Sequence, residues 1–252
     1  RPKLAGGSAG IAVMIDYGAR ARMGLMVPSG NAICEAELHA MLPPGVVALI
    51  TRLELRGSSE AELAKMLNRL EEAAGLLADA RPALLGFHCT AVSTFAPDRA
   101  AEIPARITKA SGLPAVTTAD AILAALGALG AKRILLTTPY IAAVHEREIA
   151  FLAAHGCTVM GGDMMGINTN AEMARIPPEA IAAQAREAAK ATPGADACFI
   201  SCTAIRSAGV IATLEAELGI PVITSNQVMA WHMLRRLELQ DQPRGFGRLM
   251  AL

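Results

Sequence analysis

The chain contains the stretch Gly86-Phe87-His88-Cys89-Thr90-Ala91-Val92 and, further on, the similar stretch Phe199-Ile200-Ser201-Cys202-Thr203-Ala204-Ile205. Each is an apolar run that ends in Cys-Thr-Ala. In an open α/β sheet, buried strands place ligand-contacting groups at their carboxyl ends, where the thiol and the hydroxyl stand here. The repeat therefore predicts two strands that bring Cys89 and Cys202 to one site.

The likeness continues after each of these stretches. Residues 113–123 (LPAVTTADAIL) are echoed by residues 220–230 (IPVITSNQVMA), and both read as a strand, a polar cap and a helix. Repetition of a whole strand and helix unit indicates two related halves. We expect these halves to close on a common cleft with pseudo-two-fold symmetry.

Short apolar runs alternate with amphipathic, alanine-rich stretches along the rest of the chain, which is typical of βαβ units around a parallel sheet. Helices are expected in most gaps, including one over 59–80 with a capping-type start and one that opens at Pro177-Pro178-Glu179. The pattern predicts an α/β fold. Its strands are expected at 24–27, 46–51, 83–88, 115–118, 133–137, 158–161, 197–201 and 222–224.

The length of 252 residues allows one large domain or two lobes, and the repeat favours two lobes. We expect a lead-in segment over 1–23, a first α/β lobe over 24–130 that carries Cys89, and a second over 131–252 that carries Cys202. The terminal segments are expected to cross between the lobes.

The charges balance, with 23 Lys and Arg against 23 Asp and Glu, so no net field attracts nucleic acid or an anionic membrane. Hydrophobic residues make up 53% of the chain, yet Asp16, Arg20 and Arg22 interrupt the apolar region near the amino end before it could span a bilayer. We therefore expect a small-molecule partner and neither nucleic acid nor a membrane. A homo-oligomer is a further expectation, because dimers are common among soluble enzymes.

The cysteines form no disulfide framework and no paired C-x-x-C spacing, which suits a reducing, cytoplasmic setting. Neither Cys-Thr-Ala motif has His at a usual zinc-ligand spacing, and no glycine-rich nucleotide loop is present, so we expect no metal and no cofactor. Free cysteine is often a buried core residue, and this is our interpretation for three of the five. The five are Cys34, Cys89, Cys157, Cys198 and Cys202.

Cys89 and Cys202 differ from the other three because both precede Thr-Ala at equivalent strand ends, which packing alone does not explain. A thiol has a reference pKa of about 8.5 that oriented amides can lower. It can then act as a nucleophile or exchange a proton near neutral pH. We predict that Cys89 and Cys202 form a catalytic pair, with Thr90, Ala91, Thr203 and Ala204 lining the site.

Polar loops follow other predicted strands. Ser29, Gly30 and Asn31 come after the first strand, where they are either a turn with a helix cap or contacts to a ligand. Tyr140 follows a buried strand within Thr138-Pro139-Tyr140, where its hydroxyl can donate to a carboxylate or enolate oxygen. Asn170 lies in a loop for which a plain structural role is equally open.

Together these residues resemble the Asp/Glu racemase superfamily, particularly its maleate cis-trans isomerase and arylmalonate decarboxylase branches. The resemblance covers 24–249 and is carried by Val27-Pro28-Ser29-Gly30-Asn31, Glu35-Ala36-Glu37, Thr138-Pro139-Tyr140 and Gly245-Phe246-Gly247-Arg248-Leu249, besides the two cysteine motifs. It implies two Rossmann-like lobes with parallel sheets related by pseudo-two-fold symmetry, an active site in the cleft between them, and no metal or organic cofactor.

The resemblance also implies roles for individual residues. Cys89 and Cys202 match the two family cysteines, Thr90 matches a hydroxyl donor of the decarboxylase, and carboxylate binding falls to Asn31, Tyr140 and Asn170. The decarboxylase pattern has glycine at the first cysteine position, so the presence of both thiols favours an isomerase or a racemase. Racemases of amino acids usually carry an acidic residue where Ala204 stands.

The leading prediction is a cofactor-independent isomerase that acts on a small dicarboxylate, most like maleate to fumarate. Alternatives are an arylmalonate-type decarboxylase with Cys202 as proton donor and a racemase of the same superfamily. A two-lobed, non-catalytic carboxylate-binding module is the alternative from another class.

Overall fold

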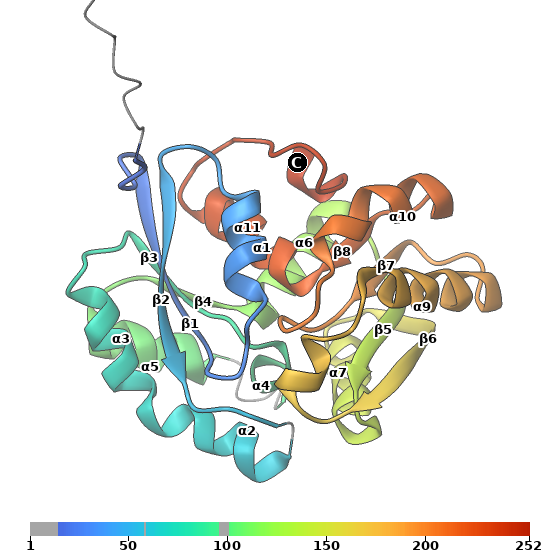
Figure 1. Cartoon of the computed structure of the whole chain (residues 1–252), viewed down its shortest axis with the longest axis horizontal. Coiled ribbons are helices and arrows are strands. Elements are labelled where there is room, and N and C mark those ends of the chain that lie inside the picture. The colour runs from blue at the N-terminus through green and yellow to red at the C-terminus, as the bar shows by residue number, and fades with distance from the viewer. Residues whose placement is uncertain (1–14, 58, 96–100) are drawn as a thin grey trace, which may run out of the picture.

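The computed structural model describes residues 15–57, 59–95 and 101–252, so residues 1–14 of the expected lead-in lie outside the described residues. Two four-stranded sheets form the framework, and every strand pair in them is parallel. The first sheet has the order β2-β1-β3-β4 and the second has the order β6-β5-β7-β8. Because the two orders match position by position, the predicted α/β fold with two related lobes is confirmed (Figure 1).

All eight predicted strands are present. Four belong to the first sheet: β1 (Ala21–Pro28), β2 (Val46–Leu53), β3 (Leu84–Phe87) and β4 (Ala115–Thr117). Four belong to the second: β5 (Arg133–Tyr140), β6 (Thr158–Ile167), β7 (Ala197–Ile200) and β8 (Val222–Thr224).

Helices fill the gaps between the strands. The α-helices are α1 (Cys34–Met41), α2 (Glu60–Met66), α3 (Leu70–Ala78), α4 (Thr90–Ser93), α5 (Glu102–Ser111), α6 (Thr118–Leu129), α7 (Ala142–Ala154), α8 (Asn170–Met173), α9 (Pro178–Ala191), α10 (Ile211–Leu218) and α11 (Ser225–Arg236). Three short 3-10 turns are η1 (Leu67–Arg69), η3 (Ala208–Val210) and η4 (Leu249–Ala251).

Two sequence-based boundaries were wrong. The helix predicted over 59–80 is divided by η1, because α2 extends to α4 whereas α3 lies on β1 and β2, and one straight helix cannot reach both. The loop predicted after the fifth strand is instead the end of β5, where Tyr140 pairs with Ile167 of an equally extended β6. Tyr140 is thus held by a sheet rather than by a loop.

The helices that follow β4 and β8 begin in the same way. Thr117 accepts a hydrogen bond from the Asp120 amide, and Thr224 accepts one from the Gln227 amide, each within a complete capping box. Ser/Thr capping satisfies amide groups that a helix start otherwise leaves without partners. The cap thus fixes where α6 and α11 begin relative to the strand ends.

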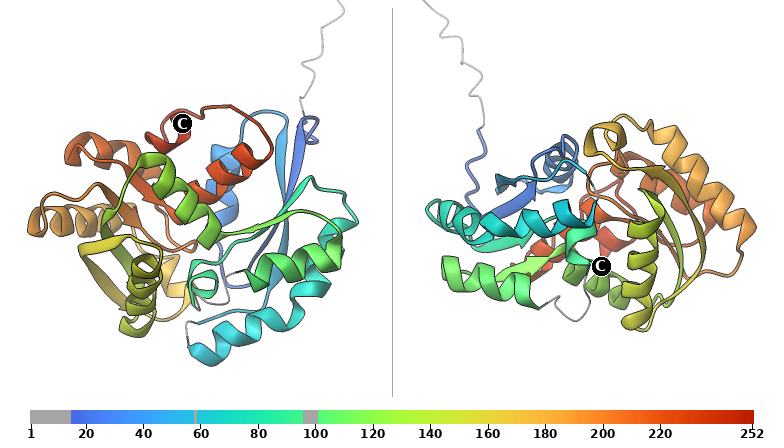
Figure 2. Two further views of the ribbon diagram at one scale, coloured as in Figure 1. Left: turned by 180° about the vertical axis from the view of Figure 1, so that it is seen from behind. Right: turned by 90° about the horizontal axis from the view of Figure 1, so that it is seen from below.

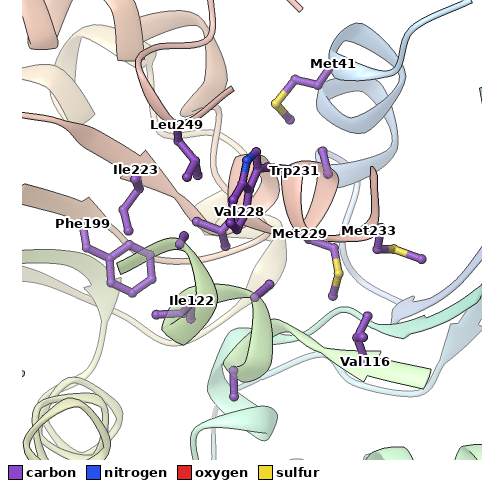
Figure 3. Close-up of a cluster of buried hydrophobic side chains, with 14 of the residues drawn as sticks. Met41, Val116, Ile122, Phe199, Ile223, Val228, Met229, Trp231, Met233 and Leu249 are labelled. Carbon is purple, nitrogen blue, oxygen red and sulfur yellow. The ribbon is translucent and has the colours of Figure 1, made fainter. Parts of the chain in front are cut away.

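The last helix of the second half packs on the first half. α11 contacts α1, α6 and β3, and it lies between the two sheets in Figure 1 and in the view from below in Figure 2. Its Val228 belongs to a buried cluster that joins Val116 of the first sheet with Phe199 of the second (Figure 3). Burial of this shared core holds the two lobes together, because each fully buried aliphatic or aromatic side chain contributes about 1.5–3 kcal/mol to the stability of the folded state.

The carboxyl-terminal segment completes this core. Gly247 has a φ of +77°, and a Cβ there would lie 2.5 Å from Cγ2 of Ile211, so only glycine fits without strain. The turn lets Phe246 O accept a hydrogen bond from Gln227 Nε2 on α11.

Within the described residues, no helix is long and apolar enough to cross a membrane. The cytoplasmic location and the homo-oligomer stay predictions.

Candidate active site

The two cysteines stand just beyond the carboxyl ends of the equivalent strands β3 and β7. Cys89 caps the short helix α4, with an extended backbone at φ −149° and ψ 109°, and Cys202 follows β7 with φ +120°. Their exposed fractions are 4% and 3%. The two thiols lie close enough for the charge on Cys202 to raise the pKa of Cys89.

Burial dominates the electrostatics of Cys89 and raises the pKa of its thiol to about 12. The backbone amides of Val92 and Ala91, in the first turn of α4, lower the pKa and act against burial, although neither forms a capping hydrogen bond to Sγ. Amides at a helix start stabilise a thiolate. Cys34, which the sequence analysis assigned to packing, is also close enough to raise the pKa of Cys89.

Cys202 has a different set of neighbours. Burial raises the pKa of its thiol to about 12, while the Tyr140 hydroxyl and the Ala204 amide lower it by hydrogen bonding. The Ala204 nitrogen is 3.3 Å from Sγ, and the thiol lies 3.8 Å from Sδ of the buried Met173. The pKa of Tyr140 is itself raised well above its usual value, chiefly by burial, so its hydroxyl is a neutral donor.

The backbone of Cys202 is in a region that residues other than glycine rarely adopt, and such strain costs on the order of 1–3 kcal/mol. Two contacts hold it there. Its amide donates to Ser225 Oγ at 3.0 Å, and the preceding residue, Ser201, is fully buried with its Oγ at 2.7 and 2.9 Å from the carboxyl oxygens of Glu148.

Glu148 is a buried carboxyl group that the sequence analysis did not identify. It lies on α7 with an exposed fraction of 1%, and burial raises its pKa to about 8, against a smaller lowering by Ser201. It is therefore mostly uncharged at neutral pH. When it is ionised, its charge raises the pKa of Cys202 and Tyr140.

Asn31 is fully buried, and its side chain performs two tasks. Its Oδ1 accepts hydrogen bonds from the amides of Ile33 and Cys34, which is the helix cap that the sequence left open as one interpretation. Its Nδ2 donates to Thr203 O at 2.9 Å and to Thr203 Oγ1 at 3.0 Å. Asn31 thus fastens the start of α1 to the loop that follows Cys202.

The remaining members of the two Cys-Thr-Ala motifs are also buried. Thr90 donates through Oγ1 to Ser225 Oγ at 2.8 Å, and Ala91, in the first turn of α4, is 9% exposed. Thr203 and Ala204 are 3% and 1% exposed. The structure therefore brings both predicted motifs to the same buried region.

Three predicted residues from polar loops, Ser29, Gly30 and Asn170, lie together around the backbone of Leu55. Asn170, at the start of α8, donates from Nδ2 to Leu55 O at 3.2 Å, and Gly30 donates its amide to the same oxygen. A Cβ on Gly30 would lie 3.2 Å from the Asn170 side chain, so these two residues are neighbours from different lobes. Ser29 is exposed and accepts the Leu55 amide through Oγ at 3.1 Å.

A buried polar chain lies behind the cysteines and was missed by sequence reasoning. His88 is fully buried, with Nδ1 at 3.1 Å from Thr118 Oγ1 and Nε2 at 2.8 Å from Asn226 Oδ1. Burial lowers the pKa of His88 to about 4, so the ring is neutral. Asn226 continues the chain to Glu37 Oε2 at 2.6 Å. The only sequence signal was the repeat of 113–123 in 220–230, which includes Asn226.

A cavity of about 230 Å³ lies beside α4, on the side of Val92 and Ser93. Most of its wall is apolar. Its other lining residues are Leu63, Ala64, Leu67, Asn68, Phe95, Glu102, Ile103 and Arg106.

No group of three or more His, Cys, Asp or Glu side chains that could hold a metal ion occurs among residues 15–57, 59–95 and 101–252. The described site presents two thiols, a neutral phenol, hydroxyls, carboxamides and backbone amides.

Comparison with known proteins gives consistent matches over nearly the whole chain. The family model described as arylmalonate decarboxylase matches residues 23–250. A maleate isomerase of Nocardia farcinica is 32% identical over 240 residues, which cover 91% of this chain and 95% of that protein. The arylmalonate decarboxylase of Bordetella bronchiseptica is 29% identical over 232 residues, which cover 90% of this chain and 95% of that protein.

Solved structures give the same result. A maleate isomerase of Pseudomonas putida, crystallised with maleate as a cysteine-to-alanine variant, has a TM-score of 0.86 at 26% identity and covers 92% of this chain and 97% of its own. A cysteine-to-serine mutant of the Nocardia farcinica maleate cis-trans isomerase, with a covalently bound succinylcysteine intermediate, has a TM-score of 0.85 at 28% identity and covers 92% of this chain and 98% of its own.

Proposed function

The chain belongs to the arylmalonate decarboxylase family, and from this premise we propose that it is a cofactor-independent isomerase that converts a small cis-dicarboxylate, such as maleate, into the trans isomer. The resemblance stated from the sequence is confirmed, since the relatives include both maleate isomerases and an arylmalonate decarboxylase. The proposal concerns which of these reactions the site performs.

The observation that carries the proposal is the pair of buried thiols in motifs that Ser225 joins, each thiol with its own polar neighbours. Isomerisation by addition and elimination needs a nucleophile at one alkene carbon and a proton donor at the other. Cys89 has the helix-start amides of Ala91 and Val92, which suit a thiolate. Cys202 has the Tyr140 hydroxyl and the Ala204 amide, which stabilise it after it has lost a proton.

In the first half of the reaction, the Cys89 thiolate forms a C–S bond to one alkene carbon, and Cys202 gives its proton to the neighbouring carbon. The carbon–carbon bond is then single and can rotate. In the second half, the Cys202 thiolate takes back a proton from that carbon, the alkene re-forms in the trans geometry, and the C–S bond breaks to regenerate the Cys89 thiolate.

The addition moves negative charge onto a substrate carboxylate, so donors to that group lower the barrier. We propose that Tyr140, Asn170, the Thr203 hydroxyl and the backbone amides of Thr90, Ala91 and Ala204 supply them, together with the loop at Ser29 and Gly30. The Thr90 hydroxyl itself donates to Ser225 Oγ. Asn31 joins them by exchanging its bond to Thr203 Oγ1 for a carboxylate oxygen, while its bond to Thr203 O continues to hold the loop.

Proton NMR of the purified protein with maleate in deuterated buffer tests the proposal. We expect the alkene signal of fumarate to appear with wild-type protein and not with Cys89→Ser, while circular dichroism shows that the variant is folded. Full activity of Cys89→Ser would overturn the assignment. With a chiral α-substituted carboxylic acid in place of maleate, entry of solvent deuterium at the stereocentre would favour a racemase. Ligand-induced stabilisation without turnover would favour a binding module.

One observation favours a second candidate, decarboxylation of an arylmalonate with Cys202 as proton donor. The cavity beside α4 is mostly apolar and, at about 230 Å³, exceeds the roughly 150 Å³ that holds benzene in a protein core. Cys89 caps the helix that lines this cavity. With phenylmalonate, release of carbon dioxide that is lost in Cys202→Ser and kept in Cys89→Ser would select this reaction.

A further inference from the structure

The first two residues of α11 each touch both cysteine motifs. Ser225 Oγ accepts the hydroxyl of Thr90, which follows Cys89, at 2.8 Å, and it accepts the amide of Cys202 itself at 3.0 Å. Ser225 and Asn226 are both fully buried.

Asn226 forms a second bridge, between His88 before Cys89 and Thr203 after Cys202. Its Oδ1 is 2.8 Å from Nε2 of His88, which precedes Cys89. Its Nδ2 donates to the carbonyl of Thr203, which follows Cys202, at 3.3 Å, and to Glu37 Oε2 at 2.6 Å. Both Nδ2 protons and the Oδ1 of Asn226 therefore have partners.

These contacts also decide the tautomer of His88. Both Nδ2 protons of Asn226 point to acceptors, so its oxygen faces the ring and must receive a proton from Nε2. Nδ1 is then the acceptor for the Thr118 hydroxyl at 3.1 Å. A neutral ring with this proton arrangement agrees with the lowered pKa of His88.

The loop after Cys202 is held from several sides by the same group of residues. The Thr203 carbonyl accepts both Asn226 Nδ2 and Asn31 Nδ2. The Glu37 carboxyl group accepts a hydrogen bond from Asn226 Nδ2 and another, at 2.8 Å, from the amide of Ala208. Ala208 lies at the far end of the loop after Cys202. The start of α11 thus lies within a network that spans α1, β3 and the loop after β7.

The equivalent start of α6 has no such bridge. Thr118 stands in the place of Ser225, and its Oγ1 contacts His88 and the Phe87 carbonyl, both in its own lobe. Ala119 stands in the place of Asn226 and has no polar side chain. The bridging pair is therefore a feature that the second half carries and the first half lacks.

We propose that Ser225 and Asn226 are positioning residues that join the two Cys-Thr-Ala motifs across the lobe boundary and set the separation of the Cys89 and Cys202 thiols. They act through Thr90, His88, Thr203 and the Cys202 amide rather than by touching the reacting atoms. A displacement of about 1 Å between catalytic groups can lower a rate about 100-fold. The kinetic part of this inference rests on the proposed isomerase function.

The test compares wild type with Asn226→Ala, Asn226→Ser and Ser225→Ala, using Gln227→Ala as the matched control. Gln227 lies next to Asn226 and serves the α11 capping box and Phe246 O, so its loss weakens the same helix start without cutting the bridge. We expect kcat for maleate to fall about 100-fold in Asn226→Ala with KM changed less than about threefold. Gln227→Ala should keep kcat within about threefold at a comparable loss of melting temperature.

A second readout does not depend on turnover. Iodoacetamide modification followed by peptide mass spectrometry shows whether one molecule carries the label on both Cys89 and Cys202. In wild type we expect one label to exclude the other, because both thiols are buried and Ser225 holds their two motifs together. In the bridge variants, including Asn226→Ser if the alanine variant does not fold, we expect molecules labelled on both.

Bridge variants that keep wild-type kcat and exclusive labelling would overturn the proposal, and so would a Gln227→Ala variant that loses as much kcat as Asn226→Ala. If no protein turns over maleate while the labelling pattern changes as expected, the isomerase proposal fails and the positioning role stands.

Discussion

Cys89 and Cys202 end equivalent strands of two equivalent sheets and are equally buried, yet their backbone conformations and polar neighbours differ. Cys89 has an extended backbone and caps a helix whose amides face its sulfur. Cys202 has a strained backbone, a phenol as partner, and a buried carboxyl group close by. The comparison teaches that a repeated scaffold can place two identical groups symmetrically while their neighbours give them different chemistry. We assign nucleophilic attack to Cys89 and proton exchange to Cys202 on this ground.

The largest expected effect separates the two thiols directly. Cys89→Ser should lower isomerisation by about 10,000-fold or more, since no nucleophile is left, and it should form no covalent adduct. Cys202→Ser should also be inactive but should accumulate a dicarboxylate adduct on Cys89, because water can slowly protonate the neighbouring carbon while no thiolate is left to remove that proton again. Intact-protein mass spectrometry after incubation with maleate measures the adduct. An adduct on Cys202 in the Cys89→Ser variant would reverse the assignment.

The next effect concerns the phenol that serves only the second thiol. Tyr140→Phe removes the hydroxyl that lowers the pKa of Cys202, and it also removes a donor to the substrate. We expect kcat to fall about 100-fold while alkylation of Cys89 by iodoacetamide keeps its wild-type rate. A variant with unchanged kcat would show that Tyr140 has no part in the proton exchange.

The third prediction concerns the carboxyl group that only the second half buries. The pKa of Glu148 is raised from 4.5 to about 8 in the folded protein, so the folded state binds this proton more tightly than the unfolded chain. Its contribution to stability is therefore complete below pH 4.5 and is lost as the pH rises toward 8. The loss is on the order of a few kcal/mol.

Glu148→Gln keeps the shape of the side chain without the charge, so its stability should fall less than that of wild type between pH 5 and about 8. Urea unfolding at several pH values measures this difference. Glu172→Gln, at an exposed position on α8, is the control. Parallel curves for wild type and Glu148→Gln would contradict the raised pKa.

The smallest effect compares the two helix starts. Thr117→Ala and Thr224→Ala each remove a capping box, at a cost of about 1 kcal/mol or a melting temperature lower by about 2–4 °C. Neither variant removes a contact of Ser225 or Asn226, so both should keep kcat within about threefold of wild type, as expected for Gln227→Ala. A larger loss of kcat in Thr224→Ala alone would show that the α11 cap also positions the bridge.

Much of the framework followed from local patterns. Strand and helix periods, together with the repeated Cys-Thr-Ala ending, predicted eight parallel strands and two thiols at matching strand ends, and the sheets have this arrangement. These features depend on neighbours along the chain and on the rule that strands of a parallel sheet end at one edge. The length of β5 was not predictable in this way. Its last residue, Tyr140, belongs to the strand because it pairs with Ile167 of β6 beyond an irregularity in the register, and no local pattern shows that pairing.

The sequence by itself determined the fold class, the repeat and the pair of cysteines, because each is written in residues that are close together in the chain. Tertiary structure alone decided the rest. It placed Glu148 against Ser201, fastened Asn31 to Thr203, and set Asn226 between His88 and Glu37, contacts that join residues 53 to 189 positions apart. Such contacts depend on how α1, α7 and α11 pack against the two sheets. No local pattern encodes that packing, because it results from burial of the whole shared core.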